Sequence, residues 1–445
     1  MLTADLTLTR ILNHLQQGHP ADKNDIKYLL NLSDPEEINQ LFKAAQNVRT
    51  RYFGNKIFLY GFLYFSTHCR NECRFCQYQS SNKTLLRYRK TKSQILAAAR
   101  EMTDAGAHLI DLTMGEDPEL YSKGEFGFKH FVDMVKTVQK EIRLPVMISP
   151  GSLPDKILAD LADTGVSWYA CYQETHNRDL YKHLRCGQSF KKRLAKKQLA
   201  KSLGMLIEEG ILTGVGETDD DLADSIIWMR DFSVDQARVM TFVPQAGTPM
   251  EKNIPQDSLK ERIIIAVMRL ILPDVLIPAS LDVDGLDGLK ARLDAGANVV
   301  TSIVPPDKGL AGVANNSLDI EDSRRTLDHI LPVLKTCGLK PALPEEYQAW
   351  TGTRQKTLNK LSCKERKLCW LPLLEENSRV SKLYTWLKKP VLRPLSLTKI
   401  LWHRPQGFVT SSWNLNSALN IRCPKTVPKL ILFFRQSRIL IFWWQ

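Results

Sequence analysis

Apolar residues near the start of the chain recur at intervals of three and four, which is the spacing of amphipathic helices. Three such sets precede position 53: Leu8, Ile11, Leu12 and Leu15; Ile26, Leu29 and Leu30; Ile38, Leu41 and Phe42. Asp34 followed by Pro35 is typical of a helix start, because Asp accepts hydrogen bonds from free amide groups and proline fits the first turn. We expect residues 1–53 to form an N-terminal helical segment without a site.

From Lys56 onward the pattern changes to short apolar runs that alternate with amphipathic stretches. The runs predicted as strands are Ile57–Phe65, Leu109–Thr113, Val146–Ser149, Ser167–Tyr172, Ile211–Val215, Arg238–Val243, Leu276–Leu281 and Val299–Val304. The stretches predicted as helices are Lys92–Ala105, Phe131–Glu141, Leu153–Thr164, Ser189–Glu209, Asp219–Phe232, Leu259–Leu272 and Leu286–Ala295. Several of these helices are followed by a glycine, as helix ends often are: Gly106, Gly165, Gly210 and Gly296.

Eight strands separated by helices are the count of an α/β fold of the (β/α)8 type, the TIM barrel. We predict such a barrel over residues 54–351, closed by a C-terminal helix. Chemistry in these barrels takes place at the carboxyl ends of the strands, so the side chains at those positions are the candidates for a site.

The pattern breaks off after about Thr351. Residues 377–445 contain no Asp or Glu, and six of the nine tryptophans lie beyond Trp350. No helical or strand period is sustained there, so we expect the basic, Trp-rich tail over residues 352–445 not to be a folded domain. A membrane-surface segment or a nucleic-acid module remains the alternative, since basic and apolar residues are mixed.

The formal charge of +13 is confined to this tail. From Lys356 onward 17 Lys and Arg stand against 3 Glu, a surplus of +14, so residues 1–355 carry −1. A near-neutral main domain argues against a nucleic-acid partner, because such binding needs a basic surface. The chain start carries Asp5 and no long apolar run, so we expect a cytoplasmic protein with no membrane partner.

Nine cysteines are too clustered and odd in number for a disulfide framework. Cys69, Cys73 and Cys76 follow the first predicted strand in one loop, where three thiolates can bind one face of a metal cluster. Three protein ligands would leave one iron of a [4Fe–4S] cluster open for a chelating small molecule. A Cys3His zinc site that includes His68, or ordinary buried thiols, are the competing interpretations.

This loop resembles that of the radical S-adenosylmethionine (SAM) enzymes, in which the open iron binds SAM and the radical is generated on SAM itself, so no catalytic side chain is assigned. The second predicted strand ends in Met114-Gly115-Glu116, which is similar to the turn that meets the amino group of SAM in that family. The fourth ends near Glu174, and Arg193 follows. By resemblance to the biotin-synthase-like branch, Glu174 would hold the ribose and Arg193 the SAM carboxylate, since a guanidinium grips a carboxylate with two bonds.

Biotin synthases need further cysteines on strands two, three and five, and those strands have none here, so sulfur insertion is not expected. Instead Asp111, Arg238 and Asp282 lie on predicted strands. Pointing inward, they would form a cavity of opposite charges suited to a zwitterionic amino acid. Arg238 and Asp282 could equally pair with each other or point outward.

Residues 8–350 resemble the methylornithine synthases of pyrrolysine biosynthesis. The similar stretches are Tyr64–Thr67 with the cysteine loop, Asp111–Pro118, Gly210–Gly216, Val239–Phe242, Leu276–Asp282, Ala295–Asn298 and Thr301–Ile303. The resemblance implies that Arg238 and Ser280 hold an α-carboxylate, and that Asp111 and Asp282 hold amino groups.

The resemblance further implies an isomerase that converts L-lysine to (3R)-3-methyl-D-ornithine. A 5′-deoxyadenosyl radical takes a hydrogen from the lysine side chain, and the skeleton fragments and recombines. An electron donor such as ferredoxin or flavodoxin would be its partner. The rival hypotheses are another enzyme of the same branch, such as a hydrogenase-cofactor maturase, and a metal-bearing nucleic-acid module that uses the tail.

Overall fold

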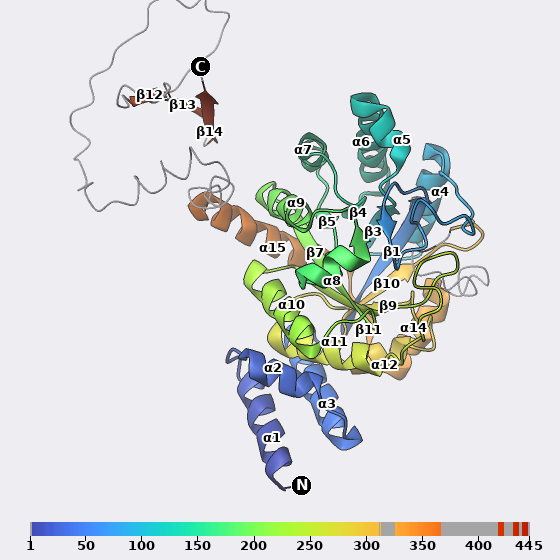
Figure 1. Cartoon of the computed structure of the whole chain (residues 1–445), viewed down its shortest axis with the longest axis vertical. Helices are drawn as coiled ribbons and strands as arrows, with labels where there is room; N and C mark the ends of the chain where they lie inside the picture. Colours follow the sequence, from blue (N-terminus) through green and yellow to red (C-terminus); the bar gives the residue numbers. More distant parts are fainter. Residues whose placement is uncertain are drawn as a thin grey trace, which may run out of the picture. The chain divides into compact units, whose positions relative to one another are not determined.

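The computed structural model describes residues 2–310, 312 and 325–365, together with three short strands in the tail. Two compact units are present, residues 1–368 and residues 369–445. The first unit contains the predicted barrel, with helices arranged around a central ring of strands (Figure 1). In the second unit β12 (Ser417–Ile421), β13 (Leu430–Arg435) and β14 (Arg438–Trp443) form an antiparallel sheet.

Eight parallel strands form the barrel. In chain order they are β1 (Lys56–Ser66), β3 (Leu109–Met114), β4 (Val146–Ser149), β5 (Trp168–Ala170), β7 (Leu206–Thr213), β8 (Gln236–Thr241), β9 (Pro278–Ser280) and β10 (Val299–Ile303). Each pairs with the next around the ring, and β10 returns to β1. Between β8 and β9 the ring closes through Ala237 N to Leu276 O at 2.9 Å and Leu276 N to Asp235 O at 3.1 Å. The predicted fold class is confirmed.

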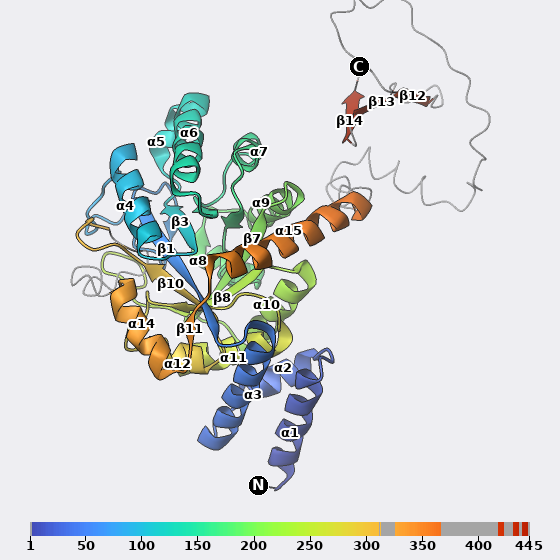
Figure 2. The same cartoon turned by 180° about the vertical axis from the view of Figure 1, so that it is seen from behind.

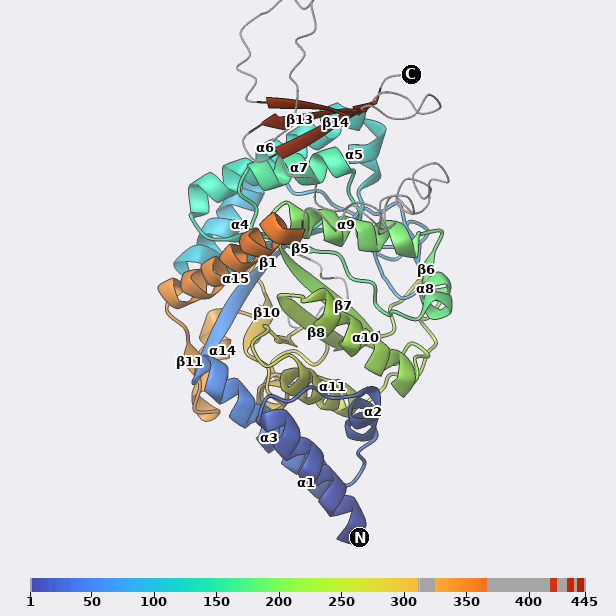
Figure 3. The same ribbon diagram turned by 90° about the vertical axis from the view of Figure 1, so that its left-hand side faces the viewer.

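Helices cover the outside of the ring in every view (Figures 2 and 3). They are α4 (Lys92–Asp104), α5 (Pro118–Ser122), α6 (Gly124–Ile142), α7 (Asp155–Asp163), α8 (Arg178–Leu184), α9 (Phe190–Ser202), α10 (Asp219–Phe232), α11 (Leu259–Ile271), α12 (Leu289–Asp294) and α14 (Leu327–Thr336). Two short strands, β2 (Glu72–Cys73) and β6 (Arg185–Cys186), form a separate antiparallel pair, and β11 (Lys340–Pro341) pairs with β1. Gly106, Gly165 and Gly296 follow helices with φ near 100°, as predicted.

The N-terminal segment forms α1 (Leu2–Gln16), α2 (Lys23–Leu30) and α3 (Pro35–Phe53). Asp34 caps α3 by accepting bonds from the amide groups of Glu36 and Glu37 at 2.9 and 3.1 Å. The apolar faces of all three helices share one core cluster with α10 and α11. These helices therefore bury their hydrophobic stripe against the barrel's outer layer.

The long helix α15 (Pro344–Glu365) follows the barrel and extends past residue 351. Its Tyr347 hydroxyl bonds that of Tyr60 at 2.7 Å, and its Trp350 stacks on Trp168 with ring centroids 6.1 Å apart. Most of the predicted unfolded tail, residues 352–445, lies outside the described residues, so that expectation stays a prediction. Within the described part, no helix combines the length and apolar character that a bilayer crossing requires.

One predicted element is wrong. The helix expected over Ser189–Glu209 ends at Ser202, and β7 begins at Leu206, five residues before the strand that we expected. Glu208 and Glu209, which looked like helix-surface positions, are wholly buried on opposite faces of β7. Gly210 is therefore not a helix end: a Cβ there would lie 2.8 Å from Cγ of Tyr172, so only glycine fits this point of the strand.

Candidate active site

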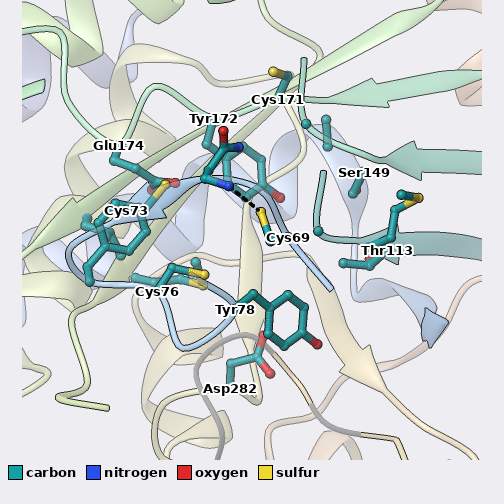
Figure 4. Close-up of a pocket in the computed structure, with 18 of the residues that line it drawn as sticks. Cys69, Cys73, Cys76, Tyr78, Thr113, Ser149, Cys171, Tyr172, Glu174 and Asp282 are labelled. Atoms are coloured by element: carbon teal, nitrogen blue, oxygen red, sulfur yellow. Dashed lines mark hydrogen bonds between the residues drawn. The ribbon is translucent and has the colours of Figure 1, made fainter. Parts of the chain in front are cut away.

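A cavity opens at the carboxyl ends of the barrel strands, and its lining combines the cysteine loop with side chains from the strands and from the loops that follow them (Figure 4). Ten of the eleven predicted site residues line it: Cys69, Cys73, Cys76, Asp111, Gly115, Glu116, Glu174, Arg193, Arg238 and Asp282. Ser280 is the exception, because it is buried directly behind Asp282. Residues dispersed over more than 200 positions therefore meet in one place.

The cysteine loop is held by backbone pairing and by one arginine. Cys73 pairs with Arg185 in the two-stranded antiparallel sheet of β2 and β6, and Cys76 N donates to Cys73 O at 3.2 Å. The guanidinium of Arg87 donates to four carbonyl groups of the loop, those of Thr67, Tyr78, Gln79 and Asn82. A loop whose carbonyls converge on one side chain keeps its shape without regular secondary structure.

The three thiols suit a multi-iron cluster. Burial raises the pKa of the Cys69 thiol to about 11, and burial together with Cys73 and Cys69 also raises the pKa of Cys76. Burial therefore disfavours a free thiolate at Cys69 and at Cys76, and a bound cationic group would offset that cost. No three His, Cys, Asp or Glu side chains of the described residues are placed to hold a single metal ion. A cluster takes each thiolate on a different iron, so three cysteines that do not converge on one point are compatible with a cluster.

The Gly115-Glu116 turn lies against the cysteine loop. Gly115 N donates to Ser66 O at 3.2 Å, and a Cβ on Gly115 would collide with the His68 carbonyl and lie 2.7 Å from Cβ of Cys69. Only glycine therefore permits this approach. The Glu116 carboxylate accepts a bond from Ser152 N at 2.8 Å and pairs with Arg70 at 3.2 Å.

Glu174 and Arg193 form another part of the cavity wall, and Arg193 lies next to the Gly115-Glu116 turn. Glu174 has φ of +69°, unusual for a residue with a side chain, and its buried carboxylate pairs with Arg185. Arg193 is buried too: its Nε donates to Tyr172 O at 2.6 Å and its Nη1 lies 3.7 Å from Glu116. Arg193 is thus not part of a solvated helix face.

Sequence reasoning assigned no role to Arg185, although it is central to this wall. Its Nη1 lies 3.5 Å from the Cys73 sulfur while Nη2 pairs with Glu174. Gln188 also donates to that sulfur, at 2.9 Å. The sequence offered one indication of a role for Arg185, namely its place between Glu174 and Arg193. Spacing alone could not show that Arg185 contacts the cysteine loop.

Deeper in the barrel lies what we call the inner chamber, formed by Asp111, Arg238 and Asp282. Ser149 Oγ donates to both oxygens of Asp111, at 2.8 and 3.0 Å. Burial, with the charge of Glu208 adding to it, raises the pKa of Asp111 to about 7. Within the described residues Asp111 forms no ion pair, so it is a carboxylate without a counter-ion.

Arg238 and Asp282 both face the chamber, and each has its own partner. Arg238 Nε pairs with Glu208 at 2.7 Å, and Asp282 pairs with Arg325 at 2.7 Å. Asp282 also accepts a bond from Ser302 Oγ at 2.6 Å. The two predicted residues therefore neither pair with each other nor point outward. Glu208 and Arg325 were missed, Glu208 because its segment was predicted as helix.

Known proteins resemble the barrel-forming part of this chain. A family model described as "Radical SAM superfamily" matches residues 63–229. The 3-methylornithine synthase of Methanosarcina acetivorans is 43% identical over 348 residues, which cover 78% of this chain and 97% of that protein. The [FeFe] hydrogenase maturase subunit HydE of Thermotoga maritima is 30% identical over 281 residues, 62% of this chain and 78% of HydE.

A crystal structure of a methylornithine synthase superposes with a TM-score of 0.73 at 43% identity. That superposition covers 76% of this chain and 99% of the other. The similarity thus spans nearly the whole length of the two methylornithine synthases, and roughly a fifth of this chain lies outside the aligned regions.

Proposed function

The chain belongs to the methylornithine synthase family of radical SAM enzymes, and from this premise we propose that it converts L-lysine to (3R)-3-methyl-D-ornithine, the first step of pyrrolysine biosynthesis. It is an isomerase, and its cofactors are a [4Fe–4S] cluster and SAM. When bound, these cofactors supply a 5′-deoxyadenosyl radical that abstracts hydrogen.

The cavity residues outside the inner chamber, which we call the outer cavity, fit these cofactors. We assign the cluster to Cys69, Cys73 and Cys76, which lie in one loop and line the cavity. The raised pKa of the Cys69 and Cys76 thiols favours their ionisation with a cationic group bound. SAM carries an ammonium, a carboxylate and ribose hydroxyls, and the outer cavity offers Glu116, Glu174 and Arg193 to them. Gly115 would bring its backbone to the ammonium end, as its close approach to the cysteine loop allows.

The charge of the inner chamber is the observation that carries the lysine assignment. Among the described residues, the chamber groups Asp111, Arg238 and Asp282 and the ion-pair partners Glu208 and Arg325 make up three buried carboxylates and two buried guanidinium groups. With all five ionised the net charge is −1. L-lysine has two ammonium groups and one carboxylate near neutral pH, so its +1 charge balances the chamber. A neutral zwitterion would leave one buried carboxylate uncompensated, which is costly.

We therefore assign the α-carboxylate to Arg238 and the amino groups to Asp111 and Asp282. Family resemblance alone assigns Ser280 to the carboxylate, since its hydroxyl lies 3.4 Å from Asp282 Oδ2 and the residue does not line the cavity. The chamber wall between these groups is apolar and includes Phe62, Tyr172 and Met240. Such a wall excludes water from reactive substrate species.

A hydrogenase-cofactor maturase is the alternative enzyme, and HydE is a more distant relative. That alternative would be favoured by an Arg238 or Asp282 that faced away from the cavity. Both line it, which supports the lysine enzyme instead. For the reducing electron we propose a small carrier protein such as ferredoxin or flavodoxin, and for the protein a cytoplasmic location.

The test is anaerobic reconstitution of the cluster followed by incubation with SAM, a reductant and L-lysine. Mass spectrometry should find an isomer of lysine that co-elutes with 3-methylornithine. Formation of 5′-deoxyadenosine without that isomer would retain radical chemistry and remove lysine as the substrate. Failure to take up iron and sulfide would remove the cluster assignment.

A further inference from the structure

The guanidinium group of Arg238 is held with one end unsatisfied. It is wholly buried on β8, where Nε donates to Glu208 Oε1 at 2.7 Å and Nη1 donates to Thr301 Oγ1 at 3.0 Å. Nη2 has no hydrogen-bond partner among the described residues, although the side chain lines the cavity. Buried donors are rarely left unpaired in a native fold, so an unpaired one in a cavity points to a ligand.

Glu208 occupies the position from which it can fix this arginine. On the β7–β8 ladder Glu208 lies opposite Gln236, and Arg238 is the next residue of β8 on the same inward face. Gln236 Nε2 donates to the same Oε1 at 2.7 Å, which orients the carboxylate. The rings of Phe62 and Tyr172 lie 5.6 and 5.9 Å from the guanidinium carbon and limit its sideways movement.

The chamber needs such a restraint because its own charges attract each other. Asp111 has no ion pair within the described residues and lies close enough to Arg238 for the two to interact electrostatically. An unrestrained Arg238 could turn to Asp111, and both binding groups would then be neutralised at once. Glu208 prevents this by binding the Nε edge, and Thr301 holds Nη1.

We propose that Glu208 is a positioning residue that, together with Thr301, keeps Nη2 of Arg238 directed into the cavity as the receptor for a substrate carboxylate. This inference rests on the proposed function in that L-lysine supplies the carboxylate. It predicts that Glu208 affects how strongly the protein prefers ligands with a carboxylate over ligands without one. A residue needed only for folding would not have this effect.

The test compares L-lysine with 1,5-diaminopentane, which has the same two ammonium groups and no carboxylate. Binding of each to the reconstituted enzyme with SAM is measured anaerobically by calorimetry. In the unaltered protein we expect lysine to bind about 10- to 100-fold more tightly, as a charge-assisted hydrogen bond implies. In Glu208→Gln we expect that ratio to fall to within about threefold of unity, since the freed Arg238 pairs with Asp111.

The charge of Glu208 alone would produce the opposite result. Removing a carboxylate beside Arg238 strengthens attraction for the lysine carboxylate and weakens binding of a dication, so the ratio would rise. A raised or unchanged ratio in Glu208→Gln therefore overturns the proposal. Glu209→Gln, on the outward face of β7, is the matched control, and it should leave the ratio unchanged.

Thr301→Val gives a second measurement that does not alter charge. It removes the Nη1 anchor, so the ratio should fall, by less than in Glu208→Gln. If Glu208→Gln fails to fold, an unchanged ratio in Thr301→Val overturns the proposal by itself. Absence of lysine binding to the unaltered protein would instead refute the proposed function, and the two failures are thus separate.

Discussion

Lysine affinity should depend on pH through Asp111. The carboxyl is buried, accepts two bonds from Ser149, and has its pKa raised to about 7, first by burial and then by the charge of Glu208. Only the ionised form pairs with a substrate ammonium. With a pKa of about 7, roughly nine tenths of Asp111 is ionised at pH 8 and one tenth at pH 6. The Kd for lysine should therefore rise about tenfold when the pH is lowered from 8 to 6.

Calorimetry across this pH range measures both the affinity and the proton balance. At pH 6 lysine binding should release close to one proton per site, and at pH 8 almost none, which buffers of different ionisation enthalpy reveal. Ser149→Ala should move the midpoint to higher pH, because the serine hydroxyl bonds the ionised form. Asp111→Asn should weaken binding at pH 8 by about 10- to 150-fold, the loss of one charge-assisted bond.

Asp111→Asn also tests whether Asp111, and not another buried group, causes the pH dependence. Asp235 is another buried carboxyl that titrates in a similar pH range, since burial raises its pKa to about 6. His176 does not, because burial lowers its pKa to about 4. If Asp111→Asn keeps the pH dependence, or if the unaltered enzyme shows none between pH 6 and 8, the assignment of an ammonium group to Asp111 is refuted.

Three further predictions concern the cluster loop and the tail. Gly115→Ala should lower iron and sulfide content by more than half, since the added Cβ collides with the cysteine loop, whereas Gly352→Ala, with open space around it, should not. Arg87→Lys should also lower iron and sulfide content, because an ammonium group cannot reach all four loop carbonyls. Arg100→Lys, at an exposed arginine, is its control, and equal loss of the cluster in both variants would contradict the role of Arg87. Truncation after Glu365 should leave iron content and lysine turnover unchanged, and loss of either would assign the tail a role.

The parts of this site that could be predicted are those encoded locally. Cys69, Cys73 and Cys76 fall within eight residues, and the Gly115 turn directly follows an apolar strand. The strand count was also readable, because parallel barrel strands are buried on both faces and appear as short apolar runs. Such signals are local and can be recognised without knowing which remote residues pack against them.

The error at β7 shows where local signals end. Glu208 and Glu209 follow a long amphipathic stretch, and two adjacent carboxylates indicate a solvated surface to any periodicity argument. In the fold each is compensated from elsewhere: Glu209 by the buried Lys197 on α9, and Glu208 by Arg238. Burial of a charge becomes visible only with its partner, and the partner is remote in sequence.

The same reasoning explains why family resemblance could identify Arg238 and Asp282 without identifying what holds them. Their partners, Glu208 and Arg325, are 30 and 43 residues away along the chain and come from different elements. Arg238 and Asp282 are therefore each half of an ion pair, and replacing one member leaves a buried charge uncompensated. A single substitution at Arg238 or Asp282 consequently measures the loss of a substrate contact plus the cost of the orphaned partner. Only double-mutant cycles over these two pairs, with ligand binding as the readout, separate the two contributions.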